Sequence, residues 1–147
     1  MSNFYLIAHR GNINGRIIEE ENKPEYIDLA ISEGYDVEID VWFQNGEWYL
    51  GHDNPETNID IKWLLDREEK LWIHCKNMGA LMEVKKYCLH YFWHENDEFT
   101  LTSKNYVWAF PTSINKQGTI SVLPEIHSQK VDGCKGVCSD FVQNYKK

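Results

Sequence analysis

Two carboxylates stand on alternate positions of one apolar segment, and a histidine follows them closely. The stretch VEIDVWFQNGEWYLGHD, residues 37–53, sets Glu38 and Asp40 among valine, isoleucine, tryptophan and phenylalanine. Alternate side chains of a strand share a face, so both acids should lie on one face of an apolar strand. Side by side they repel each other, and a bound cation would remove that repulsion. The Asn-Gly pair at 45–46 predicts a tight hairpin that returns His52 toward the acids.

Ionisable residues also gather at the ends of other apolar runs. They are His9 and Arg10 after FYLIA, His74 and Lys76 in LWIHCK, His94 after HYFW, Glu125 after ISVLP, and Asp140 in GVCSDF. In parallel α/β proteins, the carboxyl ends of the strands are where sites are built. One such residue alone is more often solvated or structural, so it is the joint arrangement that favours a functional site.

The order of strand and helix patterns differs between the two halves of the chain. We expect strands over 4–11, 35–43 and 70–77 and helices over 22–34, 58–69 and 79–88. This alternation predicts a parallel sheet with crossover helices. Five further strand-like runs follow, at 90–95, 99–103, 106–110, 119–125 and 136–141. The first three of these runs are too close together for full crossovers between them.

The chain has 147 residues, which suits one domain over 1–147. A regular eightfold βα barrel takes about 250 residues. We therefore expect an α/β fold, a compact TIM-barrel-like (βα) fold with several helices missing in the second half. Sheet left uncovered there would expose apolar surface, and Tyr91, Trp93, Trp108 and Phe110 are candidates for a homodimer interface or for the pocket wall.

Charge and composition narrow the possible partners. The net charge of −8 argues against nucleic acid, because phosphate backbones need a basic face. No apolar run approaches the ~18 residues of a membrane-spanning helix, and a signal-peptide pattern is not visible, so we expect no stable membrane insertion. The four cysteines lack zinc-site spacing, which favours a reduced, cytoplasmic protein.

Taken together, the motifs resemble the N-terminal signature of the glycerophosphodiester phosphodiesterases, which belong to the phosphatidylinositol-phospholipase-C-like TIM barrels. The family pattern of HRG, E-N, E-x-D and H-D matches, in order, His9-Arg10-Gly11, Glu21-Asn22, Glu38-x-Asp40 and His52-Asp53. LWIHCKN resembles the third strand of the family and GVCSDF its last, so the clear match covers roughly the first half of the chain. The chain departs from the family in its short length and at position 74, where the family usually has a metal-binding glutamate.

The resemblance implies metal-dependent hydrolysis of a small glycerophosphodiester or related phosphodiester. The residues it implies are His9 and His52 as acid and base, Arg10 and Lys76 for phosphate, and Glu38, Asp40, Glu21 and His74 for a divalent metal ion (Mg²⁺ or Ca²⁺, with Mn²⁺ possible). Imidazole suits proton transfer near neutral pH, and a cation with arginine offsets charge that builds on phosphate oxygens. Two alternatives stay open: a non-catalytic module that binds a phosphorylated sugar or polyol, and a lyase on a lysophospholipid or sphingolipid head group.

The histidine at position 74 leaves the metal itself open. As a ligand it would favour Mn²⁺ over Mg²⁺ or Ca²⁺, which prefer oxygen donors. The other interpretation is that His74 contacts no metal and only hydrogen-bonds phosphate or a neighbouring strand.

Overall fold

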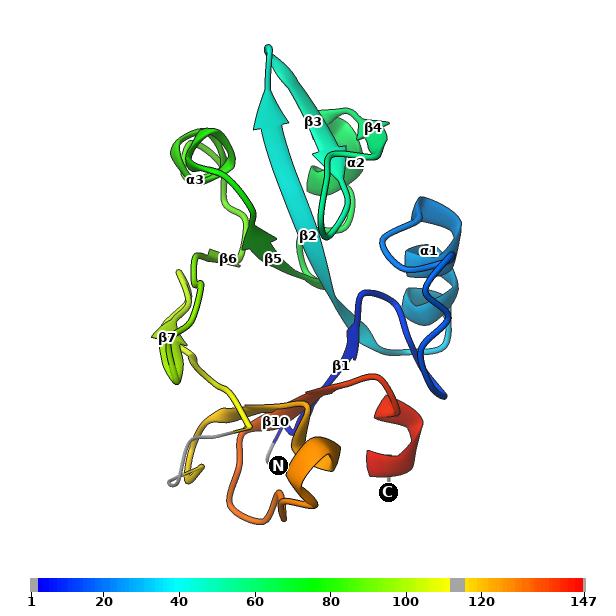
Figure 1. Ribbon diagram of the computed structural model, residues 1–147, viewed down its shortest axis with the longest axis vertical. Helices are drawn as coiled ribbons and strands as arrows, with labels where there is room; N and C mark the ends of the chain where they lie inside the picture. The colour runs from blue at the N-terminus through cyan, green and yellow to red at the C-terminus, as the bar shows by residue number, and fades with distance from the viewer. Residues whose placement is uncertain (1–2, 112–115, 147) are drawn as a thin grey trace.

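Strands dominate the structure, a computed structural model that describes residues 3–111 and 116–146 (Figure 1). The strands are β1 (Tyr5–His9), β2 (Asp36–Gln44), β3 (Glu47–Leu50), β4 (Thr57–Ile59), β5 (Leu71–Cys75), β6 (Tyr91–Phe92), β7 (Phe99–Leu101), β8 (Val107–Ala109), β9 (Ile120–Val122) and β10 (Gly136–Ser139). The helices are α1 (Pro24–Ser32), α2 (Ile61–Leu65) and α3 (Met78–Val84), with two 3₁₀ turns, η1 (Pro124–His127) and η2 (Val142–Tyr145).

All the strands belong to one mixed sheet that curls into a half-barrel (Figure 1). Seven strands run parallel in the order β6-β5-β2-β1-β10-β9-β8. Of the remaining three, β3 pairs antiparallel with β2, β7 pairs antiparallel with β8, and β4 pairs antiparallel with β3. Between β6 and β7 the curl is bridged by the amide of Ser103, which donates to the carbonyl of Tyr91 at 2.8 Å.

The expectation of a compact TIM-barrel-like α/β fold is therefore wrong. The described residues form a mixed-sheet half-barrel with only three short helices, and antiparallel strands extend it at both ends. The physical reason lies in the connections: residues 102–106 allow only a hairpin between β7 and β8, and the connection from β9 to β10 carries the 3₁₀ turn η1 in place of a helix. The expected parallel adjacency of the first three strands is confirmed, since β2 lies between β1 and β5.

Local sequence accounts for the elements of the first half. Helix α1 starts with Pro24, whose fixed φ suits a first turn, and ends before Gly34, which has a φ of +97°. Asn45 and Gly46 have φ values of 53° and 75°, the signature of a type I′ hairpin between β2 and β3. Helix α2 is shorter than expected because Thr57–Ile59 pairs with β3 as a strand instead.

The curl separates two cores. The larger one lies between the helices and the outer side of the sheet, and on β2 it takes Val37, Ile39 and Val41. A smaller cluster fills the inside of the curl; its members are Ile7, Trp72, Phe92, Trp108, Ile120, Val122 and Cys138. Because side chains alternate along a strand, Glu38 and Asp40 face this inner side. The fold thus buries both acids on the concave face.

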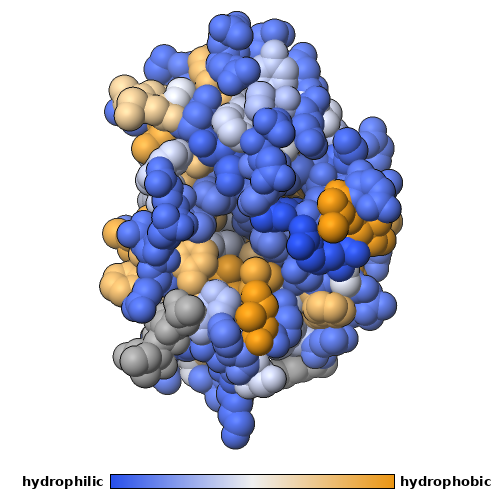
Figure 2. All heavy atoms as spheres, in the orientation of Figure 1, coloured by the Kyte–Doolittle hydropathy of each residue, from blue (hydrophilic) through white to orange (hydrophobic). Residues whose placement is uncertain are grey.

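The face of the molecule seen in the view of Figure 1 is mostly polar. Figure 2 shows a largely hydrophilic face with separate apolar patches. Within residues 3–111 and 116–146, none of the helices has the length and apolar character needed to cross a membrane.

Candidate active site

Along three parallel strands, the concave face changes from apolar to polar over two residues. Ile7 precedes His9 on β1, and Trp72 precedes His74 on β5. Phe92 on β6 precedes His94, just past the end of that strand. Each pair has the i, i+2 spacing that keeps both side chains on one face. The apolar inner cluster thus forms a floor, and the ionisable side chains lie above it at the carboxyl ends of the strands.

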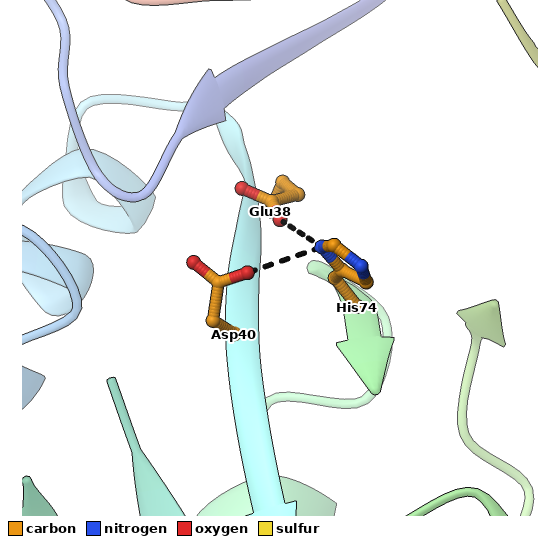
Figure 3. A group of neighbouring side chains, drawn as sticks. All are labelled: Glu38, Asp40 and His74. Atoms are coloured by element: carbon orange, nitrogen blue, oxygen red, sulfur yellow. Dashed lines mark ion pairs between the residues drawn. The ribbon is translucent and has the colours of Figure 1, made fainter. Parts of the chain in front are cut away.

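A buried group of Glu38, Asp40 and His74 lies at the centre of this layer (Figure 3). Their donor atoms all lie within 4.8 Å of one another. His74 Nδ1 is 3.1 Å from Asp40 Oδ1 and 3.8 Å from Glu38 Oε2. Two carboxylates and one imidazole are a donor set that divalent metal ions use, so this group can hold a metal ion.

The two oxygens of Asp40 have different surroundings. Oδ2 accepts a hydrogen bond from Asn22 Nδ2 at 2.9 Å, and the backbone amide of Asp40 donates to Asn22 Oδ1. Oδ1 is buried and accepts no hydrogen bond from any described residue. A buried carboxylate oxygen without a donor is costly, which a cation at this point would relieve. The unpaired Oδ1 of Asp40 is the observation that best supports a metal ion at this group.

The contact that His74 makes through Nε2 decides the protonation of that ring nitrogen. Nε2 lies 3.3 Å from the carbonyl oxygen of His94, and a carbonyl only accepts, so Nε2 carries a proton. A charged ring directs its Nδ1 proton toward Asp40, which is how His74 lowers the pKa of that acid, and loss of this proton leaves a lone pair for a metal. The ring also stacks on that of His94, with centroids 4.3 Å apart and planes 14° apart. His94 therefore orients His74 with Nδ1 ready for a metal.

The two acids have pKa values shifted in opposite directions because their neighbours differ. Burial raises the pKa of Glu38, and the neighbouring charge of Asp40 raises it further. Burial also opposes ionisation of Asp40, but His74, Arg10 and the Asn22 amide outweigh it and hold its pKa below the usual range. The pair therefore resists holding two negative charges unless a cation is close.

His9 is held by a carboxylate from the last strand. Its Nδ1 donates to Asp140 Oδ1 at 2.7 Å, and its Nε2 lies 3.8 Å from Glu38 Oε1. Asp140 also accepts from the buried Asn12 amide at 2.9 Å. Burial lowers the pKa of His9, but the hydrogen bond to Asp140 and the charge of Glu38 outweigh it, so the pKa is raised.

His52 has a similar but more exposed partner. Its Nδ1 donates to Asp53 Oδ1 at 2.8 Å, and the His52 side chain is 40% exposed. Partial burial lowers its pKa, although the charge of Asp40 opposes this. Both predicted catalytic histidines thus use Nδ1 for a carboxylate, which leaves Nε2 for other chemistry.

Arg10 occupies a strained position between the strand and the acids. Its φ of 56° is left-handed, and its backbone amide donates to the Glu38 carbonyl oxygen at 2.9 Å. Its guanidinium donates to Glu21 Oε1 at 3.1 Å, and its Nε lies 3.4 Å from Asp40 Oδ2. Such strain in a non-glycine residue is typical of sites where position matters.

Glu21 lies outside the metal group. Its oxygens accept from Arg10, Asn12 and Arg16, which outweigh burial and lower its pKa to about 2. The structure thus assigns its contacts to positioning Arg10 and Asn12, whereas the sequence suggested a metal ligand. Lys76 does approach the group, with Nζ 4.0 Å from Asp40 Oδ1.

These residues surround a cavity of about 170 Å³. Its lining comprises His9, Arg10, Glu38, Asp40, His52, His74, His94, Trp108, Phe110, Val122 and Leu123. Hollows of about 340 Å³ and 260 Å³ share His52 with it, and the latter also includes Lys76 and Trp93. A larger groove of about 860 Å³ lies elsewhere, around Trp48 and Trp63, and contains none of these histidines. The smaller cavity is therefore the candidate active site, because the ionisable groups face it.

The sequence missed three residues that form or support the site: His94, which lines the cavity, and Asp140 and Asn12, which hydrogen-bond around it. Asp140 and His94 were visible as polar residues after apolar runs, but nothing local links them to His9 and His74. Asn12 is fully buried and gives its amide to both Glu21 and Asp140. Trp108 and Phe110 belong to the cavity lining, the second of the two roles expected for the aromatics.

Comparisons with protein-family models, with curated proteins and with solved structures find no match for this chain.

Proposed function

We propose that this protein cleaves a small phosphodiester with the help of a divalent cation. The observation that carries the proposal is the shared cavity: His9 and His52 line it together with Arg10 and the group of Glu38, Asp40 and His74. A binding module needs positive charge and hydrogen-bond donors, whereas two carboxylate-paired histidines beside a candidate cation site suit proton transfer in both directions. The likeness of the motifs to glycerophosphodiester phosphodiesterases supports the same reaction class.

Each residue has a role in this reaction. One histidine removes a proton from the attacking oxygen, which belongs to water or to a hydroxyl next to the phosphate. The other gives a proton to the leaving alcohol oxygen as its bond to phosphorus breaks. Asp140 and Asp53 keep the two rings in the tautomer that exposes Nε2. A bound cation would supply charge neutralisation at the phosphate oxygens.

Arg10 and Lys76 provide the positive side of the phosphate site. A guanidinium has five N–H donors, and the contacts of Arg10 with Glu21 and Asp40 leave donors for a phosphate oxygen. Lys76 borders the adjoining hollow beside His52 and His94 and adds a point charge there.

The donor set also bears on the choice of metal. Two carboxylates suit Mg²⁺ or Ca²⁺, but the imidazole of His74 suits Mn²⁺ better than either. We infer that Mn²⁺ activates the protein most strongly.

We also propose a reduced, cytoplasmic setting, which the four free cysteines support.

The experiment is a turnover assay with a panel of glycerophosphodiesters followed by phosphorus NMR. Mn²⁺, Mg²⁺ or Ca²⁺ should support cleavage, and a chelator should stop it. His52→Ala should lower turnover by about 10²–10⁴-fold. The matched control is His127→Ala, because His127 is exposed on η1 and outside the cavity lining. Equal turnover in the two variants, both folded by circular dichroism, would remove His52 from the mechanism; no cleavage of any diester with any metal would refute the proposal.

A further inference from the structure

The cavity lining divides into two chemical sets that come from different strands. The ionisable set comes from β1, β2, β5 and the chain just after β3 and β6. The apolar set comes from β8, β9 and the residues after them; it comprises Trp108, Phe110, Val122 and Leu123. These two groups of strands lie on opposite sides of β10 in the sheet order, so the curl sets an apolar wall beside the reactive groups.

Part of the apolar wall is open to the cavity. Trp108 and Val122 belong to the buried inner core, whereas Phe110 and Leu123 are only partly buried and pack against it. Phe110 also lies against the ring of His94, with centroids 4.2 Å apart. Apolar surface beside water is unfavourable, so these two side chains favour a ligand with apolar surface of its own.

The backbone at Leu123 adds a second, independent observation. Its φ and ψ are 48° and 51°, the left-handed region that glycine and asparagine adopt with little strain and leucine rarely adopts. Leucine at this position therefore costs conformational energy and brings an apolar side chain to the cavity. Strain of this kind gathers where a side chain must face a ligand.

The size of the cavity limits what can fill it. Phe110 and Leu123 line the cavity of about 170 Å³ and neither of the adjoining hollows of about 340 Å³ and 260 Å³. The apolar contact is therefore confined to this small space, which suits a short chain next to a phosphoryl group at the cation side.

We propose that the substrate carries a short apolar substituent, an alkyl or aryl ester of a few carbons, that packs against Phe110 and Leu123. This inference rests on the proposed function and names its substrate class: a phosphodiester with one polar and one apolar alcohol. Specificity then comes from removing that chain from water beside the reactive histidines.

The test compares the methyl and butyl esters of glycerol phosphate at saturating Mn²⁺. Each buried methylene should raise kcat/KM about fourfold, so three should favour the butyl ester by roughly 60-fold. Leu123→Asn keeps a residue that accepts the left-handed backbone and removes the apolar side chain. It should reduce the preference by about tenfold. Ile126→Asn is the matched control, because Ile126 is 59% exposed on η1 and outside the cavity lining.

Calorimetric binding of methyl phosphate and butyl phosphate to the Mn²⁺-loaded protein gives a readout that does not need turnover. Tighter binding of butyl phosphate, weakened in Leu123→Asn and unchanged in Ile126→Asn, is the expected result. Equal cleavage and equal binding of methyl and butyl forms would overturn this inference and leave the proposed function standing. No cleavage of either ester, with butyl phosphate still preferred in binding, would overturn the proposed function and leave the apolar subsite.

Discussion

His9 Nδ1 lies 2.7 Å from Asp140 Oδ1, a hydrogen bond between residues 131 positions apart. It joins the carboxyl ends of β1 and β10, which pair in parallel from Tyr5 with Gly136 to Ala8 with Ser139. The strand register therefore orients His9, and Asp140 fixes which ring nitrogen faces the cavity.

Removing the charge of Asp140 should slow the proposed reaction. Asp140→Asn replaces a carboxylate that accepts from His9 and Asn12 with an amide whose NH₂ can donate to His9 Nδ1 and so favour the tautomer protonated on Nε2. We expect kcat to fall by about 10²-fold or more, with a smaller change in KM. Asp53→Asn provides the comparison, since the Asp53 side chain is 82% exposed and should matter less. Equal losses in kcat would show that the His9–Asp140 pair has no special role.

Metal preference should follow the donor at position 74. His74→Glu places a third carboxylate in the group, so Mg²⁺ affinity should rise by roughly tenfold, or about 1.4 kcal/mol. The ratio of Mn²⁺ affinity to Mg²⁺ affinity should fall. Calorimetric titration of each ion into metal-free protein measures both effects. His127→Glu adds the same charge on an exposed turn and should change neither affinity. If His74→Glu also leaves them unchanged, His74 is not a ligand.

Acid stability should depend on a histidine outside the cavity lining. His90 is buried against Trp72, with ring centroids 4.1 Å apart, and burial lowers its pKa to about 4. Below the ordinary pKa of 6.5, the unfolded chain binds a proton that the folded protein does not. Stability from this residue is thus complete above pH 6.5 and falls toward pH 4 by up to about 1.4 kcal/mol per pH unit.

His90→Gln removes this titration and keeps a group that can hydrogen-bond Thr102. Urea unfolding at pH 7, 6, 5 and 4 should show a shallower loss of unfolding free energy in the variant. His127→Gln, at an exposed position, should leave the slope of the parent protein. Parallel curves for His90→Gln and the parent would rule out proton exclusion at His90.

The glycine of the HRG motif should be needed for packing. Gly11 has a φ of +93°, and a Cβ there would lie 2.8 Å from Tyr26 Cδ2. Gly11→Ala should lower the free energy of unfolding by about 1–3 kcal/mol, through backbone strain and displacement of Tyr26. Gly46→Ala is the comparison with positive φ but with no atom within 4 Å of the added carbon. Thermal unfolding should therefore show a larger loss for Gly11→Ala.

The sequence predicted features whose cause is local. The Asn45-Gly46 turn needs only two residues of positive φ, and the shared face of Glu38 and Asp40 follows from strand alternation alone. The helix-depleted second half could be read from its short connections.

Other features depend on distant partners and left no local pattern. Strand β4 exists because Thr57–Ile59 pairs with β3, so a segment expected to begin a helix became a strand. The contacts of Glu21 depend on Arg16 and on the buried amide of Asn12, and no motif spacing distinguishes such a residue from a metal ligand. The expectation of a barrel-like fold failed because the parallel order of strands does not determine whether the sheet closes into a barrel. It also does not determine whether a helix covers each strand.

The candidate site forms only when β2 pairs with its neighbours in the native register. Glu38 is opposite His9 on β1, while Asp40 is opposite His74 on β5. A slip of one residue would exchange both acids for the valines and isoleucine of the outer core and bury two charges beneath the helices. The donor geometry for a cation therefore disappears once these strands separate. A cation that binds these donors would bind only the natively paired strands. At a concentration 100 times its Kd it would stabilise the folded chain by about 2.7 kcal/mol.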